Sequence, residues 1–277
     1  VIYNTCNSIG IDPTEIPLDE DKTYYPFSEL DSPHGLFQIE AHTNFSVCRK
    51  VKPRSLEELS AVIALARPGA LDFVDKYSDY IRSGDAQVVH NFFEEELSYT
   101  GGIPLYQEQL MKMAVRLGFT LDESEQLRRI VGKKKVDKMP EWKSKIEGKI
   151  QEQNLEEAIG DILWKVAEDS ANYSFNKSHS ISYATLAAWT VYLKFNHPKE
   201  FFLALLKMTN FEPNPQLEVS NISKELPNFD IKLLPPNLVK SDFDYCVEEG
   251  NIRYGLSSIK GISDKTLHAI QLFKEEK

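Results

Sequence analysis

Two groups of residues in this sequence have the chemistry needed to bind phosphate. Arg128 and Arg129 are adjacent within the segment LRRIVGKKK at 127–135. A guanidinium group presents a bidentate fork to phosphate oxygens and stays charged at any physiological pH. The alternative is that the two arginines, in the last turns of a helix, merely complement its dipole, an effect worth about 0.3–1 kcal/mol each. The residues alone leave both interpretations open.

The second group is the segment FNKSH at 175–179, where a loop enters a long predicted helix. The free N–H groups at a helix N-terminus bind anions, and Lys177 would reinforce such a site. Ser178 is expected to be the N-cap. His179 could donate a hydrogen bond to a phosphate or a base edge, or be an ordinary surface residue. Tyr183, one turn further on the same face, could stack on a base or sugar or pack in the core.

Other candidate chemistries in the sequence are weaker. The segment YQEQ at 106–109 contains Glu108, which has no partner acid nearby in the sequence, so we interpret it as the start of a helix that positions the arginine helix. Asp242 and Asp244 have the spacing that places two carboxylates on one face of a strand, which suits a pair of metal ions. We reject that interpretation because the segment follows Leu-Pro-Pro and leads into a predicted hairpin. The sequence contains no GxxxxGK[ST], HExxH or GxSxG motif.

Helical periodicity dominates the elements that must position these residues. Three capping boxes predict helix starts, at Ser55 with Glu58, Thr120 with Glu123, and Asn154 with Glu157. The helix after Thr120 is expected to stop with Gly132 as its C′ residue, and Pro198 is expected at the start of another helix. The third helix should bury one apolar face, formed by Leu155, Ile159, Ile162, Leu163 and Val166.

The pattern changes after about Pro227. Residues 233–236 (LLPP) predict a rigid extended piece, and residues 242–257 alternate around Glu249-Gly250-Asn251 like a β-hairpin. The segment IKGISDKTLHAI predicts a short turn around Gly261 that joins two helices. The sequence therefore predicts a mainly α fold, with a multi-helix domain at 1–227 and a small mixed lobe at 228–277 that holds a β-hairpin and a helix-hairpin-helix.

The composition is that of an ordinary globular chain. Of its 277 residues, 42% are hydrophobic and 27% are charged. No apolar run approaches the roughly 20 residues that span a bilayer, and three scattered cysteines favour a reducing compartment, so we expect a cytoplasmic protein with no membrane partner. The net charge of −10 hides a basic segment, 128–149, in which nine cations face three acids, a balance of +6.

YQEQ, LRRIVGKKK and FNKSH, in this order and at these separations, resemble the bacterial replicative DNA polymerase III α subunit, a family C polymerase. GLFQIE at 35–40 and RYGLSSIKGIS at 253–263 have counterparts in the same order. The resemblance implies the fingers region of a DNA-directed DNA polymerase, and that the palm, with its metal-binding aspartates, lies upstream of Val1. It also implies that Arg128 and Arg129 face the triphosphate of a dNTP, and that the FNKSH segment lines the nascent base pair with Asn176, Lys177, Ser178 and His179. Tyr183, on the same helix face, is added as a nucleotide-binding candidate from its spacing.

The resemblance also implies contacts with primer–template DNA. Lys133, Lys134 and Lys135 are either DNA-backbone contacts or solvated side chains. Lys260 and Gly261 belong to a helix-hairpin-helix, whose backbone N–H groups bind a phosphate of duplex DNA without reading sequence; Ser263 in a glycine position predicts weak binding or a purely structural role.

The implied reaction is template-directed nucleotidyl transfer with two Mg²⁺ ions. We expect the isolated chain to be inactive, because the palm aspartates that would hold Mg²⁺ are absent from it. The alternative is a non-catalytic DNA-binding or assembly module derived from polymerase fingers. A generic helical protein with chance motifs is a third possibility and predicts no affinity for nucleotides.

Overall fold

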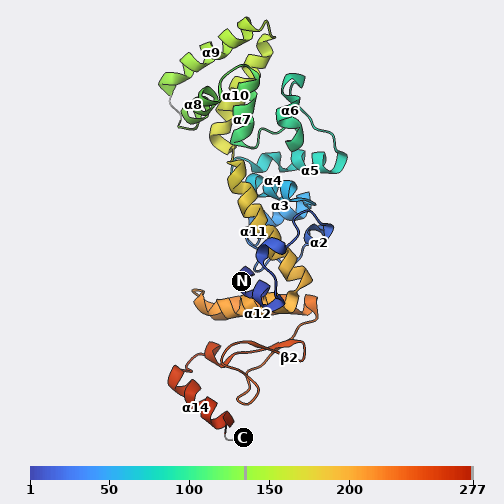
Figure 1. The fold of residues 1–277 in the computed structure, drawn as a ribbon, viewed down its shortest axis with the longest axis vertical. Coiled ribbons are helices and arrows are strands. Elements are labelled where there is room, and N and C mark those ends of the chain that lie inside the picture. Colours follow the sequence, from blue (N-terminus) through green and yellow to red (C-terminus); the bar gives the residue numbers. More distant parts are fainter. Residues whose placement is uncertain (134–135, 276–277) are drawn as a thin grey trace. The chain divides into compact units, whose positions relative to one another are not determined.

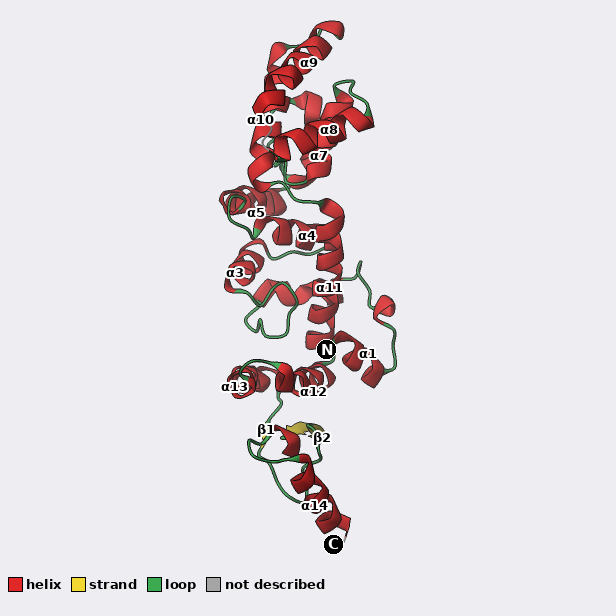
Figure 2. Ribbon diagram, turned by 90° about the vertical axis from the view of Figure 1, so that its left-hand side faces the viewer, coloured by secondary structure: helices red, strands yellow, loops and turns green. Residues whose placement is uncertain are grey.

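The computed structural model describes residues 1–133 and 136–275, which form two compact units. The first unit contains residues 1–26, 30–40 and 187–277, and the second contains residues 27–29 and 41–186. Helices make up most of both units, and the strands belong to the first (Figures 1 and 2). The expected mainly α fold is therefore confirmed. The domain boundary after residue 227 stays a prediction; residues 228–277 are part of the first unit.

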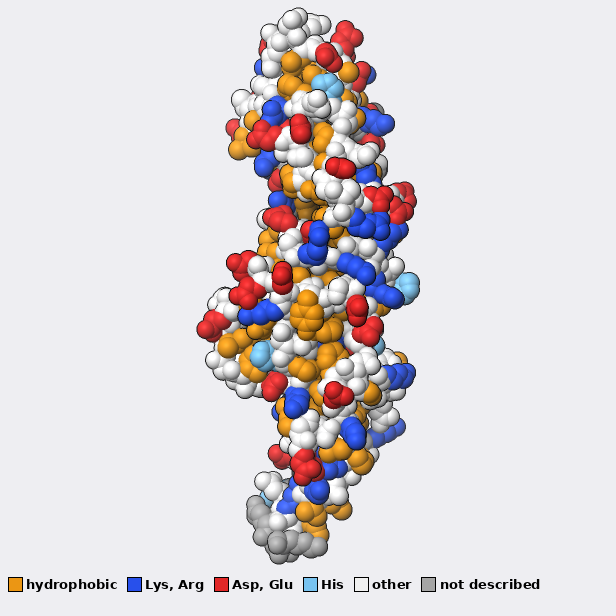
Figure 3. Space-filling view, turned by 90° about the vertical axis from the view of Figure 1, so that its right-hand side faces the viewer, with side chains coloured by type: hydrophobic (Ala, Val, Ile, Leu, Met, Phe, Trp, Pro, Cys, Tyr) orange, Lys and Arg blue, Asp and Glu red, His pale blue; other side chains and the backbone are white. Residues whose placement is uncertain are grey.

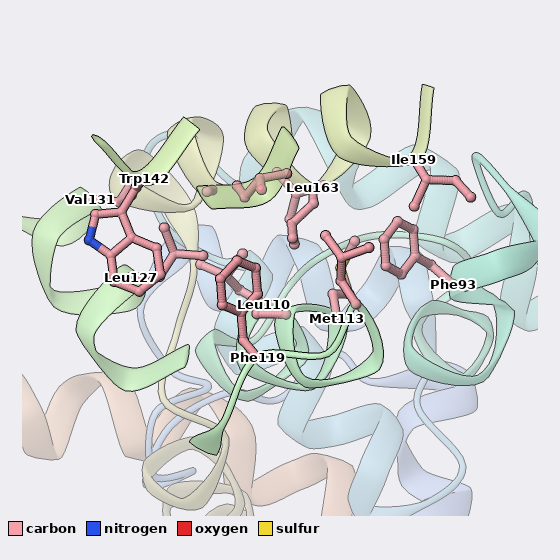
Figure 4. Packing of buried hydrophobic residues seen from close by; sticks show 14 of the residues in the cluster. Phe93, Leu110, Met113, Phe119, Leu127, Val131, Trp142, Ile159 and Leu163 are labelled. Atoms are coloured by element: carbon pink, nitrogen blue, oxygen red, sulfur yellow. The ribbon is translucent and has the colours of Figure 1, made fainter. Parts of the chain in front are cut away.

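In its described residues the second unit contains helices joined by loops, with one isolated β-bridge between Tyr106 and Phe175. Its helices are α3 (His42–Val51), α4 (Leu56–Leu65), α5 (Val74–Ser83), α6 (Glu94–Leu97), α7 (Gln107–Arg116), α8 (Leu121–Gly132), α9 (Met139–Glu152), α10 (Glu157–Tyr173) and the first half of α11 (Lys177–Asn196). Helices α7 to α10 pack around one apolar cluster (Figure 4). Trp142 from α9 is buried there beside Phe119, with ring centroids 5.7 Å apart.

The predicted apolar face of α10 is confirmed. Ile159, Leu163 and Val166 are buried in the cluster, and Leu155 and Ile162 pack against it. Gly160 lies on the same helix where α9 approaches closely, since a Cβ atom there would lie 3.1 Å from the Ile150 side chain.

The first unit combines helices with a small sheet. Its elements are α1 (Ile2–Ile9), α2 (Asp21–Tyr24), the second half of α11, α12 (Pro198–Met208), α13 (Pro215–Glu225), β1 (Leu233–Leu234), β2 (Cys246–Glu248), β3 (Asn251–Arg253) and α14 (Asp264–Glu275). The strand order is β1-β3-β2, with β1 parallel and β2 antiparallel to β3. Glu249 and Gly250 both have positive φ, 51° and 80°, as a tight hairpin turn requires. The predicted hairpin is confirmed.

A buried ion cluster holds the segment 30–40 in the first unit. The Lys194 ammonium, fully buried, donates to the carbonyl oxygens of Ser32 and His34 and to Glu225 Oε2, each at 2.7 Å. His34 Nδ1 lies 2.5 Å from the other carboxylate oxygen of Glu225. Burial lowers the pKa of Lys194, whereas the hydrogen bond to Glu225 raises the pKa of His34. The cluster ties α11 and α13 to this segment.

One of the three predicted capping boxes is confirmed in full, at Thr120, whose N–H donates to Glu123 Oε2 at 2.8 Å. At Ser55 only the predicted helix start is confirmed, because Glu58 Oε2 accepts from the Arg54 N–H instead. Ser55 and Thr120 are N-caps whose hydroxyls accept from the N–H groups of Glu58 and Glu123. The third was wrong: α10 begins at Glu157 with Glu156 as N-cap, and Asn154 has φ 52° in the turn that ends α9. Asparagine tolerates the left-handed conformation that often ends a helix, and in an extended conformation it is also a favoured N-cap.

Three other predicted helix boundaries have mixed outcomes. Gly132 is the last residue of α8 and not its C′ residue, and Lys133 follows with φ −90°. Pro198 does start α12. The turn at Gly261 (φ 93°) precedes α14 as expected, but the first arm of the helix-hairpin-helix is one 3₁₀ turn, Leu256–Ser258. Within the described residues no helix is long and apolar enough to span a membrane.

Candidate functional site

The site is built where α7 and α11, both of the second unit, begin side by side. Tyr106 and Phe175 form a parallel β-bridge: the Gln107 N–H donates to the Phe175 carbonyl at 2.8 Å, and the Phe175 N–H donates to the Leu105 carbonyl at 3.0 Å. Tyr106 is the N-cap of α7, and its N–H donates to Gln109 Oε1 at 2.8 Å. The interpretation of YQEQ as a helix start is confirmed.

The buried Tyr106 hydroxyl fixes the same junction from inside. It lies 3.0 Å from Ser60 Oγ, which lies 2.7 Å from Ser180 Oγ on α11. Burial raises the pKa of Tyr106 to about 12, so the phenol stays neutral. The three hydroxyls connect α4 and α11 with the residue that opens α7.

Glu108 connects the two helix starts directly. Its carboxylate accepts from Asn176 Nδ2 and from the Lys177 backbone N–H, both at 2.9 Å. The Asn176 side-chain oxygen accepts from the His179 N–H at 2.8 Å and from the Ser178 hydroxyl at 2.7 Å. Asn176 is therefore the N-cap, and the expectation for Ser178 was wrong, because the helix begins at Lys177, two residues earlier than expected.

A phosphate at the start of α11 would have to compete with a carboxylate. Sequence reasoning missed this role of Glu108, because its partner lies 69 positions further along the chain. The available signal was a glutamate in the first turn of α7, where acids are favoured.

Arg128 and Arg129 share one counter-ion. Arg128 donates from Nε and Nη2 to the two oxygens of Glu125 at 2.7 and 2.6 Å, and Arg129 Nε donates to Glu125 Oε1 at 2.7 Å. These hydrogen bonds, first the one from Arg128, lower the pKa of Glu125 to about 2. Arg128 Nη1 also donates to Gln107 Oε1 at 3.2 Å. Through Gln107 and its neighbour Glu108, Arg128 is linked to the start of α11.

The Lys177 ammonium lies away from Arg128's partners. It is 3.3 Å from Glu57 Oε2, 4.7 Å from the centre of the Tyr99 ring and 5.6 Å from that of Tyr106. These side chains line a cavity of about 400 Å³ between α4, α5 and the chain before α7. The backbone of Lys177 therefore belongs to the Arg128 network, whereas its side chain does not.

His179 belongs to a third environment, a column of three rings at the start of α11. Its ring centroid is 5.5 Å from that of Phe175 and 4.2 Å from that of Tyr183. The Arg67 guanidinium lies 4.3 Å from the centre of the Phe175 ring and donates to the Tyr173 carbonyl at 2.6 Å. Sequence reasoning missed Arg67, because nothing local in the sequence indicates its distant partner Phe175.

The predicted DNA-contacting residues belong to both units. Lys133, exposed, caps the end of α8 in the second unit, and Lys134 and Lys135 lie outside the described residues. Lys260 and Gly261, both exposed, precede α14 in the first unit. Figure 3 shows Lys and Arg side chains interspersed with Asp and Glu on the face it presents, without one continuous basic surface. These DNA contacts stay predictions.

Residues 1–133 and 136–275 contain no group of three or more His, Cys, Asp or Glu side chains that could hold a metal ion. Asp242 and Asp244 each accept a hydrogen bond from the next backbone N–H, at 2.7 and 2.8 Å, and precede β2.

Comparison with known proteins identifies the family. Residues 1–154 match the model of the bacterial DNA polymerase III alpha subunit finger domain. The chain belongs to this family. Residues 230–277 match the helix-hairpin-helix motif, which agrees with the predicted lobe content. The resemblance to the polymerase III α subunit is confirmed.

Several relatives are named DNA polymerase III subunit alpha. The chain is 40% identical to that of Aquifex aeolicus over 271 residues, 95% of this chain and 23% of the relative. It is 34% identical to that of Bacillus subtilis over 274 residues (98% and 24%) and 31% identical to that of Thermus aquaticus over 276 residues (97% and 22%). The chain thus spans about a quarter of the length of these relatives.

Proposed function

We propose that this finger region is part of a template-directed replicative DNA polymerase, in which it binds the triphosphate of the incoming dNTP and primer–template DNA during nucleotidyl transfer. The relatives named above support the reaction class. The observation that carries the binding role is the link from Arg128 through Gln107 and Glu108 to the start of α11. It joins two elements whose exposed polar groups suit phosphate.

Arg128 and Arg129 bind the triphosphate in this proposal. Positioning and charge stabilisation supply most of the catalysis in phosphoryl transfer, so a pair of guanidinium groups suits the task. Arg129 is accessible, since 65% of its side chain is exposed. Lys177, with Asn176 and Ser178 beside it, contributes the start of α11.

The ring column of Phe175, His179 and Tyr183 contacts the base or sugar beside the new base pair. Aromatic faces bind bases by stacking and tolerate any sequence. The exposed side chain of His179 sits between the two other rings and presents ring nitrogens at this surface. A replicative enzyme needs such a sequence-independent contact.

The DNA backbone is contacted by Lys133 and its two lysine neighbours and by Lys260 and Gly261. The palm domain, a further part of the protein or a partner subunit, carries the catalytic aspartates. Those aspartates hold Mg²⁺, which neutralises developing charge on the transferred phosphoryl group. In this proposal the chain alone does not catalyse the reaction, because the catalytic aspartates belong to the palm.

Primer extension by the whole protein tests the proposal. Arg128→Ala combined with Arg129→Ala should raise the KM for dNTPs at least about tenfold, since hydrogen bonds to charged groups are worth about 1.5–3 kcal/mol each. Lys143→Ala with Lys145→Ala removes the same charge elsewhere in the basic segment and should leave that KM unchanged. An unaltered KM in the arginine variant would remove the triphosphate role. Absence of any extension by the wild-type protein would favour the non-catalytic binding module.

A further inference from the structure

Every cation proposed to bind the triphosphate has a carboxylate partner within the chain. Glu125 accepts three hydrogen bonds from Arg128 and Arg129. Glu57 pairs with Lys177. These carboxylates take the donors that a phosphate would need.

We propose that Glu125 and Glu57 are displaceable internal counter-ions: each gives up its cation when a polyphosphate binds and takes it back when the polyphosphate leaves. The inference rests on the proposed function of Arg128, Arg129 and Lys177. It assigns to two acidic residues a direct effect on the affinity and release of the ligand.

The geometry at Glu125 supports exchange with a phosphate. Arg128 binds both carboxylate oxygens with two parallel N–H donors, at 2.7 and 2.6 Å. A phosphate accepts the same fork. Glu125 and Arg128 are both partly exposed, at 28% and 29% of their side chains, so the carboxylate can turn into water when it is replaced.

The charge state of Glu125 keeps it a competitor of the phosphate for the arginines. Its pKa of about 2 keeps it ionised at every pH at which a polymerase works. The hydrogen bond to Glu125 raises the pKa of Arg128, and the nearby negative charge of Glu108 adds to this rise. The positive charge of the two arginines is therefore already balanced when an anion arrives. This balance weakens anion binding and favours release of a product such as pyrophosphate.

The geometry at Glu57 gives a second, independent exchange. The Lys177 ammonium is held by a 3.3 Å contact to a carboxylate that is 64% exposed, and by the faces of Tyr99 and Tyr106. The Lys177 backbone N–H donates to Glu108, whose chain neighbour Gln107 accepts from Arg128. The flexible four-carbon stem of lysine allows the ammonium to leave this cavity without a backbone change.

Binding of inorganic tripolyphosphate to the whole protein, measured by calorimetry at fixed low salt, tests the inference. Breaking one partly exposed ion pair corresponds to a few-fold change in affinity. Glu125→Gln should tighten binding about three- to tenfold, and Glu57→Gln about two- to fivefold. Glu141→Gln, which changes the net charge equally but breaks the Glu141–Lys145 pair on α9, should change the affinity less than about 1.5-fold.

The sign of the effect separates this inference from a structural role. If Glu125 only positions the arginines, Glu125→Gln weakens binding, and that result overturns the inference for Glu125. Glu57→Gln tests the second exchange separately. If its affinity for tripolyphosphate equals that of Glu141→Gln, the inference for Glu57 is overturned. In a protein that already carries Arg128→Ala and Arg129→Ala, Glu125→Gln should no longer tighten the binding of tripolyphosphate. If the arginine variant binds tripolyphosphate like the wild type, the proposed function itself fails.

Discussion

Glu108→Ala removes the side chain that joins the starts of α7 and α11. The wild-type carboxylate accepts two hydrogen bonds, from Asn176 Nδ2 and from the Lys177 N–H. After the substitution, the first N–H of α11 loses its acceptor, and the Asn176 amide loses the contact that orients it. The Asn176 oxygen also caps the His179 N–H, so the change should loosen the whole first turn of α11.

The expected loss of local stability at the start of α11 follows from these contacts. Hydrogen bonds to charged groups are worth about 1.5–3 kcal/mol when buried, and helix caps about 0.5–2 kcal/mol. Asn176 is exposed and Lys177 is half-buried, so we expect about 1–2 kcal/mol for local opening of the first turn. Since about 1.4 kcal/mol corresponds to a factor of ten, amide exchange there should accelerate about five- to thirtyfold.

Amide hydrogen exchange is the suitable assay, because it reports local opening that a global unfolding curve averages away. The informative amides are those of Lys177, His179 and Ser180. Glu108→Gln keeps one acceptor oxygen and should give a smaller acceleration. Glu141→Ala, an exposed acid on α9, should give none. Exchange in Glu108→Ala at the wild-type rate would refute the idea that this carboxylate holds the start of α11.

Two further predictions concern the buried ion cluster of the first unit. Lys194→Met leaves the Glu225 carboxylate buried without its ammonium partner and should lower the free energy of unfolding by about 3–5 kcal/mol; a loss below about 1 kcal/mol in denaturant titrations would contradict this. The pKa of His34 is raised in the folded state, so its pairing with Glu225 stabilises the fold fully below the unfolded value of about 6.5 and is lost as the pH rises through the folded pKa. The wild-type protein should therefore lose more thermal stability than His34→Gln between about pH 6 and 9, and parallel melting profiles would argue against the pair.

Local signals in the sequence predicted most of the elements. The hydroxyls of Ser55 and Thr120 satisfy backbone groups three residues away, and the Glu249-Gly250 turn needs positive φ at two neighbouring positions. Each of these causes acts over a few residues, so it is visible in the sequence. Asn154 shows the limit, because the same side chain suits a helix N-cap and a left-handed C-terminal position, and only the packing of α9 against α10 decides between them.

The contacts of the candidate site could not be predicted in the same way. Its residues were found by their chemical type, but their partners, Glu108 for the start of α11 and Glu57 for Lys177, lie 69 and 120 positions away along the chain. Those pairings depend on how α4, α7 and α11 pack. Sequence spacing therefore indicated which residues carry charge, while the counter-ions that modulate this charge required the structure.

The parallel bridge between Tyr106 and Phe175 brings the YQEQ and FNKSH segments together in one site. It sets the register in which Glu108 reaches the Lys177 N–H and in which Phe175 stacks between Arg67 and His179. A shift of one residue would turn each side chain to the opposite side of the chain. The residue spacing within YQEQ and FNKSH must therefore satisfy both the helix starts and the register of the bridge. These constraints apply although neither segment carries a catalytic group.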